Sequence, residues 1–386
     1  MPRRNLRSLL AATALAALVT IAPSAPVATP AQAQPQPDTP VPAGFRPQSL
    51  TWVGTAQGFA LGTAPCAAGT CTTVARTHDG GATWSVAGTM TSPIAPLDGP
   101  GVSEIDFSTL AFGWASGRSL EQTTDGGRTW APTPVPGGGQ QVLSLVATLG
   151  QVHAVVSACA PSQPSCPTPP TLWRAAVTRP PIVWSPVAGV DLPNGSTPYV
   201  RAYGNATYVV AQQFEGPDVF YASANGSTWT PRPSPCDKSI HLDSLADVAP
   251  SSATDVALVC VGQPGLSQAV KQVYRSHDGG ATTRSAGTAP LNGITTGLAA
   301  TPGGTLAMAT WAAGGSWIYL NDTCGPCWTT ALDASPGPGA GWNDLTFTDE
   351  STGWVVFSPV NIGPDASTLM TSTDGGRTWA PAPLTR

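Results

Sequence analysis

Charged side chains are scarce in this sequence. They make up 10% of its 386 residues, whereas a typical globular domain has about 25%. Lysine occurs only at Lys238 and Lys271, and acidic residues outnumber basic ones by 22 to 17. This acidic balance argues against nucleic acids and anionic membranes as main partners, because both attract basic surfaces. Hydrophobic residues still reach 41%, which is enough for a sizeable core.

No apolar run is long enough to cross a membrane. Residues 9–22 form an apolar run of 14 residues, and a spanning helix needs about 20. Three arginines precede this run within residues 3–7, and Ala-Gln-Ala follows at residues 31–33, an arrangement typical of a secretory signal. We therefore expect a signal peptide over 1–33, a Pro/Gln-rich tether over 34–43, and a protein that is secreted or held in the cell envelope. The export route, general secretory or twin-arginine, stays open.

Long helix-forming segments are also lacking. The chain has 41 prolines and 42 glycines, and a proline inside a helix breaks it. This argues against helix bundles and most α/β folds and leaves a turn-rich, all-β protein. No zinc-ligand spacing, phosphate-binding loop or dinucleotide fingerprint occurs, so we expect no metal and no cofactor.

The eight cysteines all follow the predicted signal peptide. An even number in an exported protein indicates disulfides, although eight cysteines allow 105 pairings. Sequential pairing would give four local bridges. Cys324-Gly325-Pro326-Cys327 matches the thioredoxin active-site tetrapeptide, but it lies between two strand-like segments and opens no helix, so we favour a structural bridge over a redox site. The eight are Cys66, Cys71, Cys159, Cys166, Cys236, Cys260, Cys324 and Cys327.

One short motif recurs along the chain. Residues 77–84 read Thr-His-Asp-Gly-Gly-Ala-Thr-Trp, and residues 123–130 and 372–379 repeat the pattern. Residues 276–283 lack the final Trp, and residues 223–229 form a shorter version. Asp bonds nearby amides and Gly supplies positive φ, so the motif predicts a hairpin turn between two strands. The residues assigned to these turns are Asp79, Trp84, Asp125, Trp130, Asn225, Trp229, Asp278, Asp374 and Trp379.

The spacing of the motif predicts the fold. We take the last residue of each motif, usually Trp, as a marker, and Trp184, position 283 and Trp328 complete the series. The seven markers, from Trp84 to Trp379, are separated by 46, 54, 45, 54, 45 and 51 residues, which is the size of a propeller blade. A second pattern precedes the turn, as in Ile105-Asp106-Phe107 followed by Gly113-Trp114, and supplies two further strands. Seven such units tile residues 44–386. We therefore predict an all-β, seven-bladed β-propeller of four-stranded antiparallel blades.

The repeated turn resembles the Asp-box (BNR) repeat of sialidases, sortilin-type receptors and photosystem II assembly-factor-like propellers. The resemblance covers residues 44–386, and the Phe-x(5)-Gly-Trp pattern before the turn is most similar to the assembly-factor-like group. It implies a sialidase-like propeller in which the Asp-box is a structural turn away from the ligand face. Three functions stay open: a non-catalytic binding or scaffold module outside the membrane, an exo-sialidase-like glycoside hydrolase, and an envelope complex assembly factor.

The sialidase alternative implies an arginine triad, a Tyr/Glu nucleophile pair and an Asp acid/base. Arg128 and Arg377 lie within the repeated turns, and Glu121 directly precedes one, so none is well placed for chemistry. We therefore expect no catalytic residues and favour a monomeric binding module with an unidentified extracellular protein or glycan partner. Propellers often bind ligands at a mouth of the central channel, which makes the following inner-strand residues candidates: Arg46, Glu104, Tyr199, Arg201, Asp243, Trp342 and Asp344.

Overall fold

The computed structural model describes residues 39–384 apart from ten short segments: 96–99, 161–165, 179, 214–215, 238–243, 263–264, 266, 323–326, 336–339 and 360–366. The predicted signal peptide, the start of the tether, Asp243 and Cys324 lie outside the described residues. Within the described part, every regular element is a β-strand except one 3₁₀ turn, η1 (Pro136–Gly138). No helix there has the length and apolarity that a membrane span requires.

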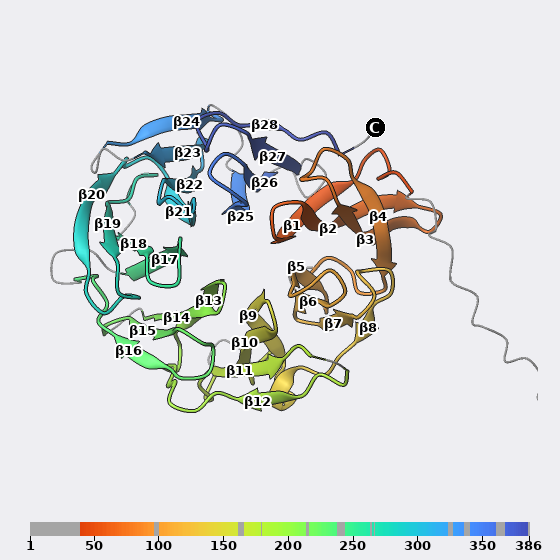
Figure 1. The fold of residues 1–386 in the computed structure, drawn as a ribbon, viewed down its shortest axis with the longest axis horizontal. Coiled ribbons are helices and arrows are strands. Elements are labelled where there is room, and N and C mark those ends of the chain that lie inside the picture. Colours follow the sequence, from red (N-terminus) through yellow and green to blue (C-terminus); the bar gives the residue numbers. More distant parts are fainter. Residues whose placement is uncertain are drawn as a thin grey trace, which may run out of the picture. The chain divides into compact units, whose positions relative to one another are not determined.

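The strands form seven four-stranded antiparallel sheets arranged in a ring (Figure 1), which confirms the predicted fold class. Blade 1 comprises β1 (Arg46–Val53), β2 (Gln57–Cys66), β3 (Gly69–Thr77) and β4 (Ser85–Met90). Blade 2 comprises β5 (Val102–Phe107), β6 (Gly113–Gly117), β7 (Leu120–Thr123) and β8 (Ala131–Pro132). Blade 3 comprises β9 (Gln141–Thr148), β10 (Gln151–Ser157), β11 (Thr171–Ala176) and β12 (Trp184–Pro186). Blades 4 and 5 comprise β13 (Thr197–Tyr203), β14 (Ala206–Gln212), β15 (Val219–Ser223) and β16 (Thr230–Arg232); and β17 (Ser244–Pro250), β18 (Val256–Val261), β19 (Lys271–Ser276) and β20 (Arg284–Ala289). Blades 6 and 7 comprise β21 (Ile294–Ala300), β22 (Leu306–Ala312), β23 (Gly315–Asn321) and β24 (Thr329–Asp333); and β25 (Ala340–Phe347), β26 (Gly353–Pro359), β27 (Thr368–Ser372) and β28 (Ala380–Pro381).

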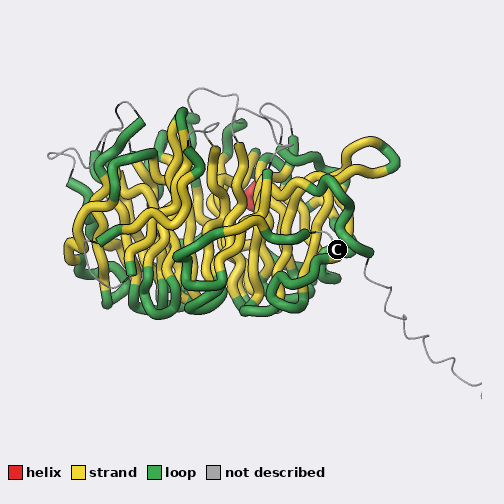
Figure 2. Tube along the Cα trace, turned by 90° about the horizontal axis from the view of Figure 1, so that it is seen from above, coloured by secondary structure: helices red, strands yellow, loops and turns green. Residues whose placement is uncertain are grey.

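The second strand of each blade carries much of the core. In β18 all six residues, Val-Ala-Leu-Val-Cys-Val, are buried, because blades pack face to face and cover both sides of this strand. Strands buried on both faces are continuous in apolar residues instead of alternating with polar ones. Seen edge-on, the strands run across the thickness of the ring and the loops gather at its two faces (Figure 2).

The repeated turn joins the third and fourth strands of a blade, and its hydrogen bonds explain its sequence. In blade 1, Asp79 Oδ1 accepts hydrogen bonds from Thr77 Oγ1 and the Thr83 amide, both at 2.8 Å, and Asp79 Oδ2 accepts one from Thr83 Oγ1 at 2.6 Å. The Gly81 amide donates to Thr77 Oγ1, and Trp84 Nε1 donates to the Gly81 carbonyl. The aspartate-centred bonds recur at Asp125, Asp278 and Asp374.

The second glycine of the turn also packs the blade against its neighbour. Gly81 has a φ of +87°, which residues with a side chain rarely adopt, and a Cβ there would lie 2.3 Å from Trp354 of blade 7. Gly280 of blade 5 approaches Phe220 of blade 4 in the same way, at 2.7 Å. The turn is therefore a contact between blades as well as a hairpin.

The ring closes without a shared blade, because each sheet consists of four consecutive strands. Blades 1 and 7 meet through an aromatic cluster, in which the ring of Trp354 lies 5.0 Å from that of Trp52 and 6.2 Å from that of Trp84. Val41 and Leu384, near the two ends of the described chain, pack into the same apolar cluster.

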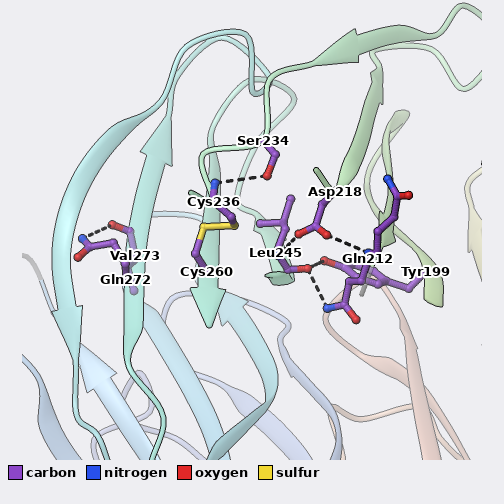
Figure 3. Close-up of a disulfide and its surroundings, with 10 residues drawn as sticks. Tyr199, Gln212, Asp218, Ser234, Cys236, Leu245, Cys260, Gln272 and Val273 are labelled. Carbon is purple, nitrogen blue, oxygen red and sulfur yellow. Dashed lines mark hydrogen bonds between the residues drawn. A yellow bond between two sulfur atoms is a disulfide. The ribbon is translucent and has the colours of Figure 1, made fainter. Parts of the chain in front are cut away.

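Three disulfides tie the loops. Cys66–Cys71 closes the β2–β3 hairpin, Cys159–Cys166 closes the loop after β10, and Cys236–Cys260 ties the segment after β16 to β18 (Figure 3). These pairs confirm the predicted disulfide bonding for six of the eight cysteines. Cys327 is also disulfide-bonded, but its expected partner Cys324 lies outside the described residues, so that pairing stays a prediction.

Candidate functional site

The innermost strands are linked around the ring by side chains that bond the backbone of the next blade. Four such hydrogen bonds, 2.7–3.2 Å long, run from the amides of Ile105, Val200, Leu298 and Leu50 to the side-chain oxygens of Ser49, Ser144, Asp247 and Asp344, respectively. A β-bulge interrupts the pairing of first and second strands in six of the seven blades, and β13 of blade 4 is the regular one. Bulges re-aim side chains, and they are enriched beside active sites.

Six polar side chains on the innermost strands of four blades interact with one another electrostatically or by direct contact. We call them the axial cluster: Glu104 and Asp106 from β5, Tyr199 and Arg201 from β13, Asp247 from β17, and Asp344 from β25. Their charges act on one another across the ring, since Asp344 affects Glu104, and Arg201 affects both. The cluster thus holds four carboxylates and one guanidinium.

Arg201 connects blade 4 to blade 5. Its Nε donates to Asp247 Oδ1 at 3.1 Å, and its guanidinium lies 5.0 Å from the centre of the Tyr199 ring, a cation–π distance. The Tyr199 hydroxyl donates to the Leu245 carbonyl at 3.1 Å, and Gln212 Nε2 donates to the same carbonyl at 2.9 Å (Figure 3). These contacts hold Arg201 in place, while 43% of its side chain remains exposed.

Three carboxylates of the cluster have raised pKa values. Burial among the blades and the charge of Asp344 raise the pKa of Glu104 to about 7. Burial, Glu104 and Asp344 raise the pKa of Asp106 well above its usual range, and burial raises that of Asp344. Asp344 is nevertheless solvent-exposed, and Glu104 and Asp106 are partly so. Water therefore reaches the cluster, and the desolvation is weaker than in a dry core.

The structure brings together four of the seven residues predicted for the ligand site, namely Glu104, Tyr199, Arg201 and Asp344. Trp342 is 3% exposed, and its Nε1 donates to the Thr310 carbonyl at 3.0 Å, so it packs inside the ring wall. Arg46 opens β1 and is partly buried. Asp243 lies outside the described residues.

Two members of the axial cluster, Asp106 and Asp247, were missed by the sequence reasoning. A signal for both was present. Asp106 lies two residues after Glu104, on the same face of one strand. Asp247, Glu104 and Asp344 each lie three residues before the last residue of an inner strand, namely Pro250, Phe107 and Phe347.

The axial cluster differs from the site that the sialidase resemblance implies. Carboxylates accept hydrogen bonds and attract cations, and a single arginine adds one anion contact. The sialidase resemblance implies three converging arginines, whereas the axial cluster contains one. Among the described residues, no group of three or more His, Cys, Asp or Glu side chains could hold a metal ion.

No protein-family model matches the sequence, and no curated protein sequence matches it. Solved structures do match its fold. The chain is similar to YCF48 from Cyanidioschyzon merolae, with a TM-score of 0.56, 14% identity, and coverage of 87% of this chain and 98% of that one.

Two further structures extend the comparison. The β-propeller domain of the Trilobed protease from Pyrococcus furiosus, described as having an open velcro topology, has a TM-score of 0.54 and 9% identity, covering 89% of this chain and 96% of that chain. Saccharomyces cerevisiae Sqt1 has a TM-score of 0.50 and 12% identity, covering 88% and 95%. At these identities the similarity shows the fold alone.

Proposed function

We propose that this chain is an exported, non-catalytic propeller of the Asp-box type that binds a protein or glycan partner at the axial cluster. The observation that carries the proposal is that four carboxylates on the inner strands of three blades interact electrostatically with Arg201 of a fourth, which also bonds one of them directly. Mutual repulsion makes this cluster unfavourable for folding, and perturbed titratable groups gathered in one place are typical of functional sites.

The chemistry of the cluster favours a partner rich in hydrogen-bond donors. Lysine or arginine side chains of a protein would be attracted by the carboxylates, and sugar hydroxyls would donate to them. Tyr199, with Arg201 over its ring, adds an aromatic face next to the acids. A cationic partner would bind less tightly as salt rises, whereas a neutral glycan would be nearly indifferent to salt.

Several features support export. Three disulfides fit an oxidising compartment, and the basic and apolar segments within residues 1–33 fit a cleaved signal. An envelope assembly factor would be one form of the same binding module, with a client protein as the partner.

The test uses purified residues 34–386 and two parallel screens, a pull-down from the envelope fraction of the producing cells and a glycan array. Any partner found is then titrated against Glu104→Gln and Arg201→Gln, with Glu350→Gln as a control on an exposed hairpin. We expect each axial variant to bind at least tenfold more weakly, about 1.4 kcal/mol, and the control to bind normally. Partners that bind both axial variants like the wild type would contradict the proposal, and so would turnover of a fluorogenic sialoside.

A further inference from the structure

A cavity separate from the axial cluster lies between blades 5 and 6. Its volume is about 250 Å³, the space of about eight water molecules. Ser251, Asp255, Arg275 and His277 line it from blade 5, and residues 302–304 line it from blade 6. It is therefore bounded by the first hairpins of two neighbouring blades and by the start of a repeated turn.

Arg275 brings an incompletely paired positive charge to this cavity. Its Nη1 donates to the Gly304 carbonyl at 2.8 Å and its Nη2 to Asn321 Oδ1 at 3.5 Å, and both acceptors are neutral. A guanidinium has five N–H donors, so three have no acceptor among the described residues. None of the ion pairs in the described part of the chain involves Arg275. Burial lowers the pKa of Arg275, as expected for a charge without a nearby counter-charge.

The one carboxylate that lines the cavity is already engaged. Asp255 Oδ2 accepts a hydrogen bond from Ser252 Oγ at 2.6 Å, and Asp255 Oδ1 pairs with Nδ1 of His277. The bonds from Ser252 and His277 lower the pKa of Asp255, so it is ionised but locally compensated. Asp255 would repel a doubly charged anion about twice as strongly as a monoanion, so a site with one guanidinium favours a monoanion.

We propose that this cavity binds a small carboxylate, of about the size of a sugar acid, through the guanidinium of Arg275. Planar carboxylates match the fork of a guanidinium, which can hold both oxygens at once. Ser251, whose hydroxyl makes one long hydrogen bond of 3.5 Å to the Asp255 carbonyl, and the backbone of Gly303 supply polar groups for the rest of the ligand. The site lies in a different part of the blades from the axial cluster and does not depend on the function proposed for it.

A similar tripeptide precedes the repeated turn at a second cavity of the protein. Arg275-Ser276-His277 before the blade 5 turn matches Arg76-Thr77-His78 before the blade 1 turn, and the second tripeptide also lines a cavity, of about 280 Å³. That cavity is bounded by Trp84, Pro383 and Leu384 in addition to its polar residues. Similar tripeptides, with Ser in one and Thr in the other, thus line a cavity in both blades, and the blade 5 cavity combines the charged side chains of Arg275 and Asp255 with apolar walls such as Val256 and Leu306.

The test is a titration of the purified chain with sodium glucuronate at low salt, followed by isothermal calorimetry, with glucose and inorganic phosphate as comparison ligands. A ligand of this size should bind with a dissociation constant of about 1 mM or tighter. Arg275→Gln should weaken glucuronate binding at least tenfold. Arg284→Gln is the matched control, because Arg284 is exposed and lies opposite Arg275 in the strand register of β19 and β20.

A second variant keeps the test independent of folding. Ala300→Leu would fill part of the cavity while leaving the bonds of Arg275 in place, and it should also abolish binding. Thermal melts of each variant verify that it is folded. Absence of saturable glucuronate binding by the wild type would overturn the proposal. Equal binding by Arg275→Gln, equal loss in Arg284→Gln, or equally tight binding of glucose would overturn it as well.

Discussion

Glu104→Gln removes one negative charge from the axial cluster while keeping the shape of the side chain. The glutamine oxygen can still accept the hydrogen bond that the Leu145 amide donates to Glu104. Burial and Asp344 raise the pKa of Glu104 from 4.5 to about 7. The folded protein therefore holds a proton at pH values at which the unfolded chain has released it, so stability is lost as pH rises from about 4.5 to 7.

The magnitude follows from this linkage. One pKa unit corresponds to 1.36 kcal/mol, so the rise in the pKa of Glu104 sets an upper limit of roughly 3.4 kcal/mol. Water reaches the cluster, which reduces the effect, and we expect glutamine to raise the free energy of unfolding by about 1–3 kcal/mol at pH 8. At pH 4 the glutamate is largely protonated in both states, so the variant and the wild type should be nearly equal.

The assay is unfolding in urea, an uncharged denaturant that does not screen the cluster, followed by tryptophan fluorescence at pH 4 and pH 8. Glu350→Gln, on an exposed hairpin, is the control and should change little at either pH. The reasoning is refuted if Glu104→Gln fails to stabilise the protein at pH 8, or if it stabilises the protein equally at pH 4.

Three further predictions concern the ring itself. Trp354→Ala and Trp114→Ala should each lower the free energy of unfolding in urea by about 3–5 kcal/mol, because both side chains are buried. Only Trp354→Ala should speed limited proteolysis at the junction of blades 1 and 7, where Trp354 packs. His153 is fully buried and burial lowers its pKa, so its own contribution to stability should be lost as pH falls below about 6.5, opposite in sign to the contribution of Glu104, and the stability of His153→Gln relative to the wild type should rise over that range in pH-resolved melts. Replacing both Cys236 and Cys260 with alanine should cost about 3 kcal/mol in urea unfolding, because their bridge closes a loop with a sequence separation of 24.

The fold was predictable because its signals are local. Each Asp-Gly turn depends on residues within eight positions of one another, and such turns repeat at blade-sized intervals. The contact of Gly81 with Trp354 was not predictable in this way, because the two residues meet only when the ring closes.

The candidate site was only partly predictable for a related reason. Trp342 is of a residue type that often contacts ligands, yet it is buried. It lies directly before the β-bulge between Asn343 and Thr346 in β25. A bulge adds a residue and reverses which side chains face the axis, and no single-strand pattern reports it. Asp247 belongs to the axial cluster because Arg201, from the neighbouring blade, donates a hydrogen bond to it, and this contact between blades cannot be read from either strand alone.

The closure of the ring by whole blades has a consequence for how the chain can be rearranged. Each blade is an uninterrupted stretch of sequence, and Val41 and Leu384 meet in one apolar cluster. A short linker could join these two positions, and new termini could then be opened in the link around residues 134–140 without dividing any sheet. Such a circular permutant would place the junction of blades 1 and 7 in the middle of the chain, and individual blades could be exchanged as cassettes without disturbing their neighbours' backbone pairing.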